Sequence, residues 1–158
     1  MVGGSEVDPK LATAFTKRTG AKSYPSLEEL IEGGKRGLYP ELHGLDIVTS
    51  GCPCPYRSNA GSLTSRKGKE KRKASSERHL FEKQVEFFEI FRPRAAMIEQ
   101  PPPSATHLAE YMRVVEGMQE CGYRCQHRVL NCSEHGEHTS RRRWMIGWLS
   151  RSESHPIH

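Results

Sequence analysis

The sequence lacks several features that would assign it to a broad class of protein. None of its apolar runs approaches the roughly 20 residues that are needed to span a bilayer. The opening segment, MVGGSEVDPK, has neither the basic end nor the apolar run of a secretory signal peptide. No segment of the chain is repeated elsewhere in it. These absences argue against a membrane protein and against a solenoid, and we expect a soluble, intracellular protein without a membrane partner.

Cysteine spacings that are typical of disulfide frameworks and zinc sites are also absent. The chain has five cysteines, an odd number, and no secretion signal, which argues against a disulfide framework. No CxxC pair occurs, and the single residue between Cys52 and Cys54 gives a poor chelate spacing for tetrahedral zinc. A small zinc-binding protein is therefore only our third hypothesis. Its ligands would come from Cys52, Cys54, Cys121, Cys125 and His135.

What the chain does have is enough length for one domain, and a basic segment. Its 158 residues are 35% hydrophobic and 27% charged, which is polar for a compact domain but not typical of disorder. The formal net charge is +5, and residues 65–78 account for it with seven Lys or Arg and two Glu. Such a segment is either a solvated loop or a surface that faces nucleic-acid phosphates. We delimit a basic flexible loop at residues 62–78.

Hydrophobic periodicity and chain breakers predict alternating helices and strands. Asp8 can cap a helix that begins at Pro9 and stops at Gly20, and Ser26 with Glu29 has the pattern of a capping box. Later apolar residues recur at helical spacing, with apolar runs of strand length between them. This alternation predicts an α/β layer fold with a largely parallel sheet. The expected helices are 9–19, 26–34, 76–92 and 104–121, and the expected strands are 45–50, 95–99, 123–131 and 143–150.

Chemically useful side chains follow two of the expected strands. Ligands of α/β sheets bind beyond the carboxyl ends of the strands, where both Cys54 and Glu99 fall. Cys54 stands between two prolines that stiffen its backbone, and its thiolate would be a nucleophile, although an isolated cysteine is more often a small buried hydrophobe. Glu99 ends the apolar run AAMI, where burying a carboxylate without a partner costs free energy, so a buried Glu99 would need a partner or a role. The alternative is that Glu99 is an acid on a surface loop. Arg141 and Arg143 fall on one side of the last strand, suited to holding a carboxylate, a phosphate or a base edge.

Taken together, these segments resemble the motifs of cytosine-specific C5 DNA methyltransferases. GCPCPYRSNAG resembles the nucleophile motif of the family, roughly G-F-P-C-Q-P-F-S-x-x-G. RHLFEKQVEFFEIFRPRAAMIEQ is similar to its segment of R-G-x-L-F, a helix, R-P-K and E-N-V. GYRCQHRVLNCSEHGEHTSRRRWMIG is similar to the segment with V-L-N and two arginines, and EVDPKLATAFTKRTG resembles the acidic motif that meets the cofactor ribose. Order and spacing agree over about residues 5–149.

The resemblance implies a DNA (cytosine-5-)-methyltransferase, which transfers a methyl group from S-adenosylmethionine to C5 of cytosine in double-stranded DNA. Cys54 matches the nucleophile that attacks C6, and Glu99 matches the glutamate that is held at N3 of the ring. Arg143, and less closely Arg141, match the arginines that brace the base and the glutamate. The target base must leave the base stack before it can react. The cofactor-binding residues expected from the resemblance are Glu6, at the ribose, and Pro53.

The resemblance also implies an α/β, Rossmann-like S-adenosylmethionine-dependent methyltransferase fold that is incomplete. The family's first strand with its D-x-F-x-G-x-G loop, its target recognition region and its last helix and strand motifs have no match, and its asparagine after the glutamate is Gln100 here. We therefore expect residues 1–158 to be a partial catalytic domain of low stability with an open sheet edge, which a complementary methyltransferase fragment would complete. The alternative is a catalytically inactive remnant or a DNA-binding fragment. The expected compartment is the nucleus in a eukaryote, and the cytoplasm or nucleoid for a bacterium or phage.

Overall fold

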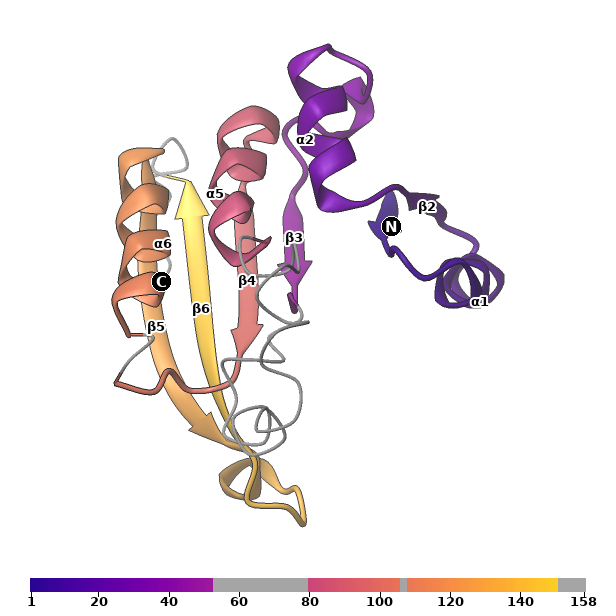
Figure 1. Cartoon of the computed structure of the whole chain (residues 1–158). Coiled ribbons are helices and arrows are strands. Elements are labelled where there is room, and N and C mark those ends of the chain that lie inside the picture. The colour runs from indigo at the N-terminus through magenta and orange to yellow at the C-terminus, as the bar shows by residue number, and fades with distance from the viewer. Residues whose placement is uncertain (53–79, 106–107, 151–158) are drawn as a thin grey trace, which may run out of the picture.

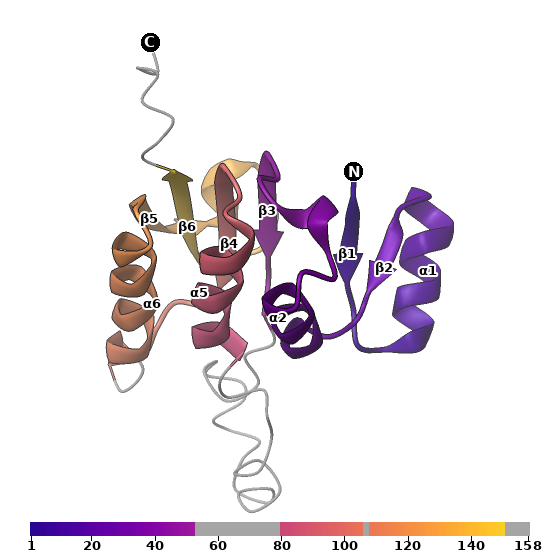
Figure 2. The ribbon, with the colours of Figure 1, turned by 90° about the horizontal axis from the view of Figure 1, so that it is seen from above.

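The computed structural model of the chain has helices along one face of its strands (Figure 1). It describes residues 1–52, 80–105 and 108–150. In Figure 2, helices α2, α5 and α6 lie in one layer and the strands in another, so the predicted α/β class is confirmed. The helices are α1 (Pro9–Thr19), α2 (Leu27–Lys35), α5 (Leu80–Phe91) and α6 (Leu108–Glu120), with 3-10 turns η1 (Pro40–Leu42) and η4 (Cys132–His135). The strands are β1 (Gly3–Ser5), β2 (Lys22–Tyr24), β3 (Ile47–Ser50), β4 (Ala95–Gln100), β5 (Tyr123–Asn131) and β6 (Arg142–Ser150).

The larger sheet has four strands in the order β3-β4-β6-β5. Strands β3 and β4 are parallel and are connected through α5, whereas β6 pairs antiparallel with both β4 and β5. The predicted largely parallel direction holds for β3, β4 and β5, whereas β6 runs opposite to all three. The connection from β5 to β6, residues 132–141, holds a 3-10 turn and is shorter than the crossover of about a dozen residues that parallel strands require.

A second, two-stranded sheet lies beyond the β3 edge of the larger one in both Figure 1 and Figure 2. Its strands β1 and β2 are parallel, with Gly3 opposite Lys22, and α1 connects them. The sequence predicts α1 but not β2, because three residues are too few to display the period of a strand. The carboxyl ends of the two strands are tied together, since Ser5 Oγ donates a hydrogen bond to the carbonyl of Pro25.

Helix boundaries follow the capping residues that the sequence predicts. The Asp8 side chain accepts hydrogen bonds from two backbone N–H groups of the first turn of α1, and Gly20 ends that helix with a φ of 69°. Ser26 and Glu29 form the reciprocal capping box of α2. The segment 76–92 is helical from Leu80 onward in the described part, and the basic loop assigned to 62–78 lies outside the described residues. No helix in the described ranges is long and apolar enough to cross a membrane.

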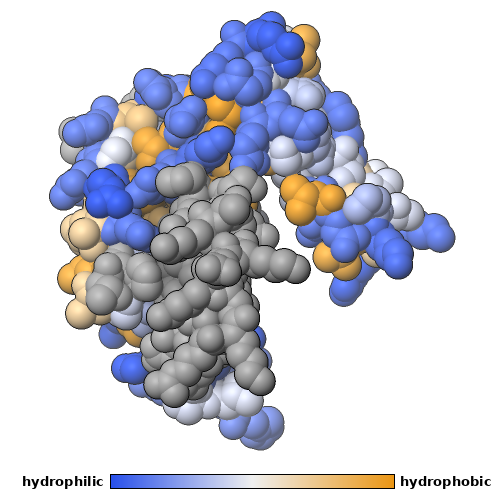
Figure 3. Space-filling model, viewed as in Figure 1, coloured by the Kyte–Doolittle hydropathy of each residue, from blue (hydrophilic) through white to orange (hydrophobic). Residues whose placement is uncertain are grey.

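The core fills the space between the four-stranded sheet and helices α5 and α6. Alternate strand residues, such as Ile98 and Ile146, point toward these helices and are fully buried. The outer surface of the helix layer is mainly hydrophilic (Figure 3). On the other side of the sheet, where no described helix packs, Ile47 is 68% and Met97 is 48% exposed. We call this side the open face; its large apolar residues are Ile47, Met97, Leu130, Met145 and Leu149.

Candidate active site

The carboxyl ends of β3 and β4 lie side by side. Ser50 of β3 is in register with Ile98 of β4, so the residues that follow each of them come together at one edge of the sheet. Cys52 and Glu99 are therefore neighbours in this part of the fold, as the order of strands and helices predicts. Cys54 and Pro53, which the sequence assigns to the nucleophile and to the cofactor, lie just outside the described residues.

Glu99 and Arg143 form an ion pair across two antiparallel strands. Met145 of β6 lies directly opposite Glu99, and Arg143 is its diagonal neighbour on the same face of the sheet. Arg143 Nε contacts Glu99 Oε1, and its Nη1 donates a 2.9 Å hydrogen bond to the Arg142 carbonyl. The Glu99 side chain is 41% exposed and that of Arg143 is 22% exposed. Glu99 is thus less buried than its place after an apolar run suggests, because it points to the open face.

The Glu99 carboxylate also lies against the end of β3. A Cβ atom added at Gly51 would lie 3.6 Å from Glu99 Oε2, which is an ordinary van der Waals distance. The carboxylate therefore stands directly beside the backbone that leads from β3 to Cys54. A carboxylate fixed by a guanidinium at this place can accept a hydrogen bond from a group that lies beside Gly51.

A second polar contact at this edge is not apparent from the sequence. Gln100 follows Glu99 on β4, but it points into the core and is 0% exposed. Its Nε2 donates a 3.1 Å hydrogen bond to the carbonyl of Cys52. The Cys52 thiol lies 3.8 Å from the carbonyl of Leu80, at the beginning of α5. The sequence does carry a sign of this role: Gln100 directly follows the candidate acid, and strand alternation places its amide on the buried side.

Aromatic side chains pack against the buried side of this sheet edge. Tyr111 of α6 is fully buried, and its hydroxyl donates a 3.0 Å hydrogen bond to the carbonyl of Pro101, just beyond β4. Its ring lies 4.6 Å from that of Trp144 and 4.9 Å from that of Phe81, measured between centroids. Trp144 is paired with Gln100 in the sheet, so this cluster packs beneath the site. The cluster fixes the ends of β4 and α5 relative to each other.

The remaining predicted site residues lie apart from this pair. Glu6 follows β1, is half-buried, and its Oε1 accepts a 3.0 Å hydrogen bond from the backbone N–H of Asp8. Arg141 precedes β6, is exposed, and takes part through its backbone in bonds with Thr139 and Cys132. Within the described ranges, no contact joins either side chain to the Glu99–Arg143 pair. Of the predicted residues, the structure therefore brings together Glu99 and Arg143.

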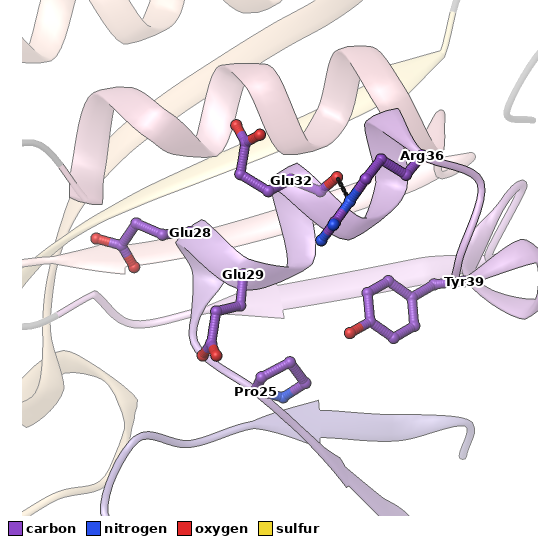
Figure 4. A pocket seen from close by; sticks show the side chains of 6 residues that line it. All are labelled: Pro25, Glu28, Glu29, Glu32, Arg36 and Tyr39. Carbon is purple, nitrogen blue, oxygen red and sulfur yellow. Dashed lines mark hydrogen bonds between the residues drawn. The ribbon is translucent and has the colours of Figure 1, made fainter.

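Metal ligation and a hollow beside α2 are the two other features that bear on a site. In the part of the chain that the structure describes, no group of three His, Cys, Asp or Glu side chains is placed to hold a metal ion. A hollow of about 280 Å³ lies beside α2, lined by Pro25, Glu28, Glu29, Glu32, Arg36 and Tyr39 (Figure 4). Its Glu29 belongs to the capping box, and Arg36 Nε donates to the backbone oxygen of Glu32, so these groups serve the fold of α2.

Comparison with known proteins identifies relatives along nearly the whole chain. The family model described as C-5 cytosine-specific DNA methylase matches residues 1–156. Among curated proteins, the Type II methyltransferase M.CviJI of Paramecium bursaria Chlorella virus IL3A is 32% identical over 106 residues, which are 67% of this chain. The matched part is 26% of the relative, so the chain spans about a quarter of the length of that protein.

Solved structures of methyltransferases share the fold. A DNMT2 mutant of Spodoptera frugiperda has a TM-score of 0.65 at 11% identity, covering 99% of this chain and 44% of that one. The methyltransferase EhMeth of Entamoeba histolytica has a TM-score of 0.62 at 14% identity, covering 98% of this chain and 46% of that one. The methyltransferase fold that the sequence predicts is thereby confirmed.

Proposed function

Since the chain belongs to the C-5 cytosine-specific DNA methylase family, we propose that it methylates cytosine at C5 in DNA, with S-adenosylmethionine as donor, through a covalent cysteine adduct. The observation that carries the proposal is the Glu99–Arg143 ion pair beside Gly51, where the chain leads toward Cys54. An acid, its guanidinium partner and a nearby thiol are the groups that this reaction needs in one place.

In the proposed mechanism Cys54 attacks C6 of the flipped cytosine as a thiolate. The new S–C6 bond moves the electron pair of the C5–C6 double bond onto C5, which becomes nucleophilic. Glu99, held by Arg143, acts in its protonated form and donates its proton to N3, which stabilises the charge that the attack places on the ring. After C5 has received the methyl group, solvent water takes the C5 proton, the electron pair of the C5–H bond forms the C5–C6 double bond again, and the S–C6 bond breaks to release the Cys54 thiolate. The proton on N3 returns to the Glu99 carboxylate. S-adenosylmethionine supplies the electrophilic methyl group when it is bound.

Glu6 fits the sugar part of this cofactor. Its carboxylate is half-buried at the carboxyl end of a parallel strand pair, and such an end is where α/β folds bind nucleosides. The bond between Ser5 and Pro25 fixes the two strand ends beside it. Carboxylate oxygens accept hydrogen bonds from hydroxyl groups, so Glu6 suits the ribose diol. Pro53 is proposed as a further cofactor contact and Arg141 as a second brace at the base.

Double-stranded DNA is the proposed substrate and partner. The target cytosine must be extruded from the duplex, and the basic loop at 62–78 is proposed to hold phosphates, since each Lys or Arg at the backbone releases a counterion. A complementary methyltransferase fragment is a second proposed partner, because residues 1–158 are proposed to be a partial catalytic domain. The chain spans about a quarter of its curated relative, which motivates this proposal.

A tritium-transfer assay tests the proposed function. Labelled S-adenosylmethionine is incubated with duplex DNA and the unchanged chain, Cys54→Ser, Glu99→Gln or the matched control Cys132→Ser. We expect Cys54→Ser to lose transfer, Glu99→Gln to lose on the order of 10²-fold or more, and Cys132→Ser to retain it. Equal transfer by the unchanged chain and Cys54→Ser, or none by the unchanged chain, would contradict the proposal.

A further inference from the structure

A buried amide side chain holds the end of β3. Gln100 is 0% exposed, and its Nε2 donates a 3.1 Å hydrogen bond to the carbonyl of Cys52. Its Oε1 has no hydrogen-bond partner among the described residues, although it is buried. An amide in the core is costly when half of it is unpaired, whereas an apolar side chain of the same length would fill the space without that cost. The contact with Cys52 is therefore the feature that an apolar residue could not supply.

The position of the bonded carbonyl matters because of the residues that follow it in the sequence. The carbonyl of Cys52 belongs to the peptide unit that joins Cys52 to Pro53. A proline ring fixes its own φ near about −65°, and the residue before a proline is restricted to extended conformations. In the sequence, Cys54 follows two positions after Cys52, so the carbonyl that Gln100 holds belongs to the last described residue before the proposed nucleophile.

We propose that Gln100 is a positioning residue, whose amide holds the carbonyl of Cys52 at the end of β3 and so fixes the backbone from which the chain continues to the proposed nucleophile, Cys54. This inference rests on the proposed function for its catalytic consequence. Glu99 and Gln100 are consecutive on β4 and point to opposite faces of the sheet. One strand end thus supplies both an acid on the open face and, from the core, the amide that holds the neighbouring chain. Glu99 lies beside Gly51 and Gln100 bonds the carbonyl of Cys52, so the two side chains flank consecutive residues of the chain that leaves β3.

Gln84, on helix α5, provides a matched control among the buried residues. It is 3% exposed, and its Oε1 also has no partner in the described part of the chain. Its Nε2, however, donates to the carbonyl of Phe81 within its own helix, at 3.3 Å. Replacing either glutamine by methionine removes one buried amide and one unpaired oxygen. Only the replacement of Gln100 releases the carbonyl that precedes Pro53.

The first experiment compares Gln100→Met with Gln84→Met in the full chain. We expect kcat for methyl transfer to fall on the order of 10²-fold in Gln100→Met, with KM for DNA within about twofold of the unchanged chain. Gln84→Met should keep its kcat, and the two variants should unfold at similar temperatures. A fall in kcat of the same size in both variants, or in neither, would overturn the positioning role.

A second measurement does not depend on activity. Hydrogen–deuterium exchange at Gly51 and Cys52 should become faster in Gln100→Met but not in Gln84→Met, because only the former frees this backbone. Unchanged exchange in Gln100→Met would overturn the proposal. Should the unchanged chain transfer no methyl group, the proposed function fails, while the exchange comparison still decides whether Gln100 holds the strand end.

Gln100→Glu adds a rescue that a purely structural role would not show. A protonated carboxyl group can donate a hydrogen bond to the carbonyl of Cys52, whereas a carboxylate cannot. In this variant we expect exchange at Gly51 and Cys52 to become slow again as the pH is lowered. In the unchanged chain, exchange at these residues should not depend on pH after correction for the intrinsic exchange rate. Exchange in Gln100→Glu that is equally fast at every pH would count against the hydrogen bond as the cause.

Discussion

On β5, two side chains that pack against the helix layer resist ionisation. Burial raises the pKa of the Cys125 thiol from 9.0 to about 11. Burial also raises the pKa of Tyr123 from 10.0 to about 12, against the opposing charge of Arg92. The Tyr123 hydroxyl donates a 2.8 Å hydrogen bond to the carbonyl of Pro93, which ties β5 to the start of β4. Both groups stay neutral in the folded protein at pH values where the unfolded chain ionises.

Alkaline pH should therefore destabilise the fold in a defined window. Between pH 9.0 and about 11 the unfolded thiol has lost a proton that the folded Cys125 retains, so the free energy of unfolding falls as the pH rises. Cys125→Ala removes this contribution and should make the fall shallower in that window. Urea unfolding followed by circular dichroism, from about pH 8 to about pH 11, measures the slope. Equal slopes for both proteins would show that Cys125 is not the cause.

Residue by residue, the candidate site was only partly predictable. Glu99 and Arg143 each lie at a strand end in the sequence, and the ion pair between them agrees with their predicted common site. The hydrogen bond from Gln100 to Cys52 joins residues 48 positions apart, and its existence depends on the parallel register of β3 and β4. Local periodicity does not determine such a register. The roles of Cys54 and Glu6 stay predictions.

Helices α2 and α5 approach each other closely at a glycine. Gly34 of α2 lies where a Cβ atom would be 2.6 Å from a ring carbon of Phe91 and 2.9 Å from Ile90. Phe91 is fully buried, so its ring cannot move aside without disturbing the core. The glycine thus sets the distance between the two helices. Helix α2 directly follows β2 of the two-stranded sheet in the chain, so this contact connects that part of the chain to α5.

Gly34→Ala should therefore destabilise the protein, although alanine is the better helix former. Overpacking typically costs about 1–3 kcal/mol, which exceeds the gain of about 1 kcal/mol in helix propensity. Gly117→Ala, within α6, is the matched control, because its added methyl group comes no closer than 3.0 Å to the half-buried Val85 side chain. We expect a lower midpoint of denaturant unfolding for Gly34→Ala than for Gly117→Ala. The opposite order would contradict the close packing at Gly34.

Helices and long strands of this chain follow from local signals, while the pairing of strands does not. Capping at Asp8 and Ser26 is encoded in adjacent residues, and both caps form as predicted. The antiparallel insertion of β6 between β4 and β5 depends instead on a short connection and on contacts distant in sequence. Alternation of helices and strands alone favoured a parallel sheet, because it does not distinguish a hairpin at the end from one more crossover.

Considered as a whole, the molecule covers only one side of its larger sheet with described helices. Ile47 and Met97 are large apolar side chains that are 68% and 48% exposed on the open face. Strand β3 pairs with β4 on one side only, within the described residues. Sheets with parallel strands are normally covered on both faces, and an open edge with apolar neighbours favours association.

We expect the chain to self-associate, and lysine on the open face to reduce this. The double variant Ile47→Lys, Met97→Lys should sediment as smaller species at equal concentration, because charge is placed on the exposed apolar surface. Its thermal midpoint should change little, since exposed substitutions usually alter stability by about 0.5 kcal/mol or less. Leu11→Lys, on the exposed side of α1, is the matched control and should leave association unchanged. A monomeric unchanged chain would contradict the prediction.

The central place of β6 also has a consequence for synthesis on the ribosome. Strand β6 is the last strand in the described sequence, yet it lies between β4 and β5 and supplies both antiparallel pairings of the sheet. Until it emerges, β5 has no partner and the inner side of β4 is unpaired. A nascent chain therefore leaves these edges unpaired until β6 has left the ribosome, so the larger sheet closes late in synthesis. A ribosome that pauses within β6 would prolong this vulnerable state.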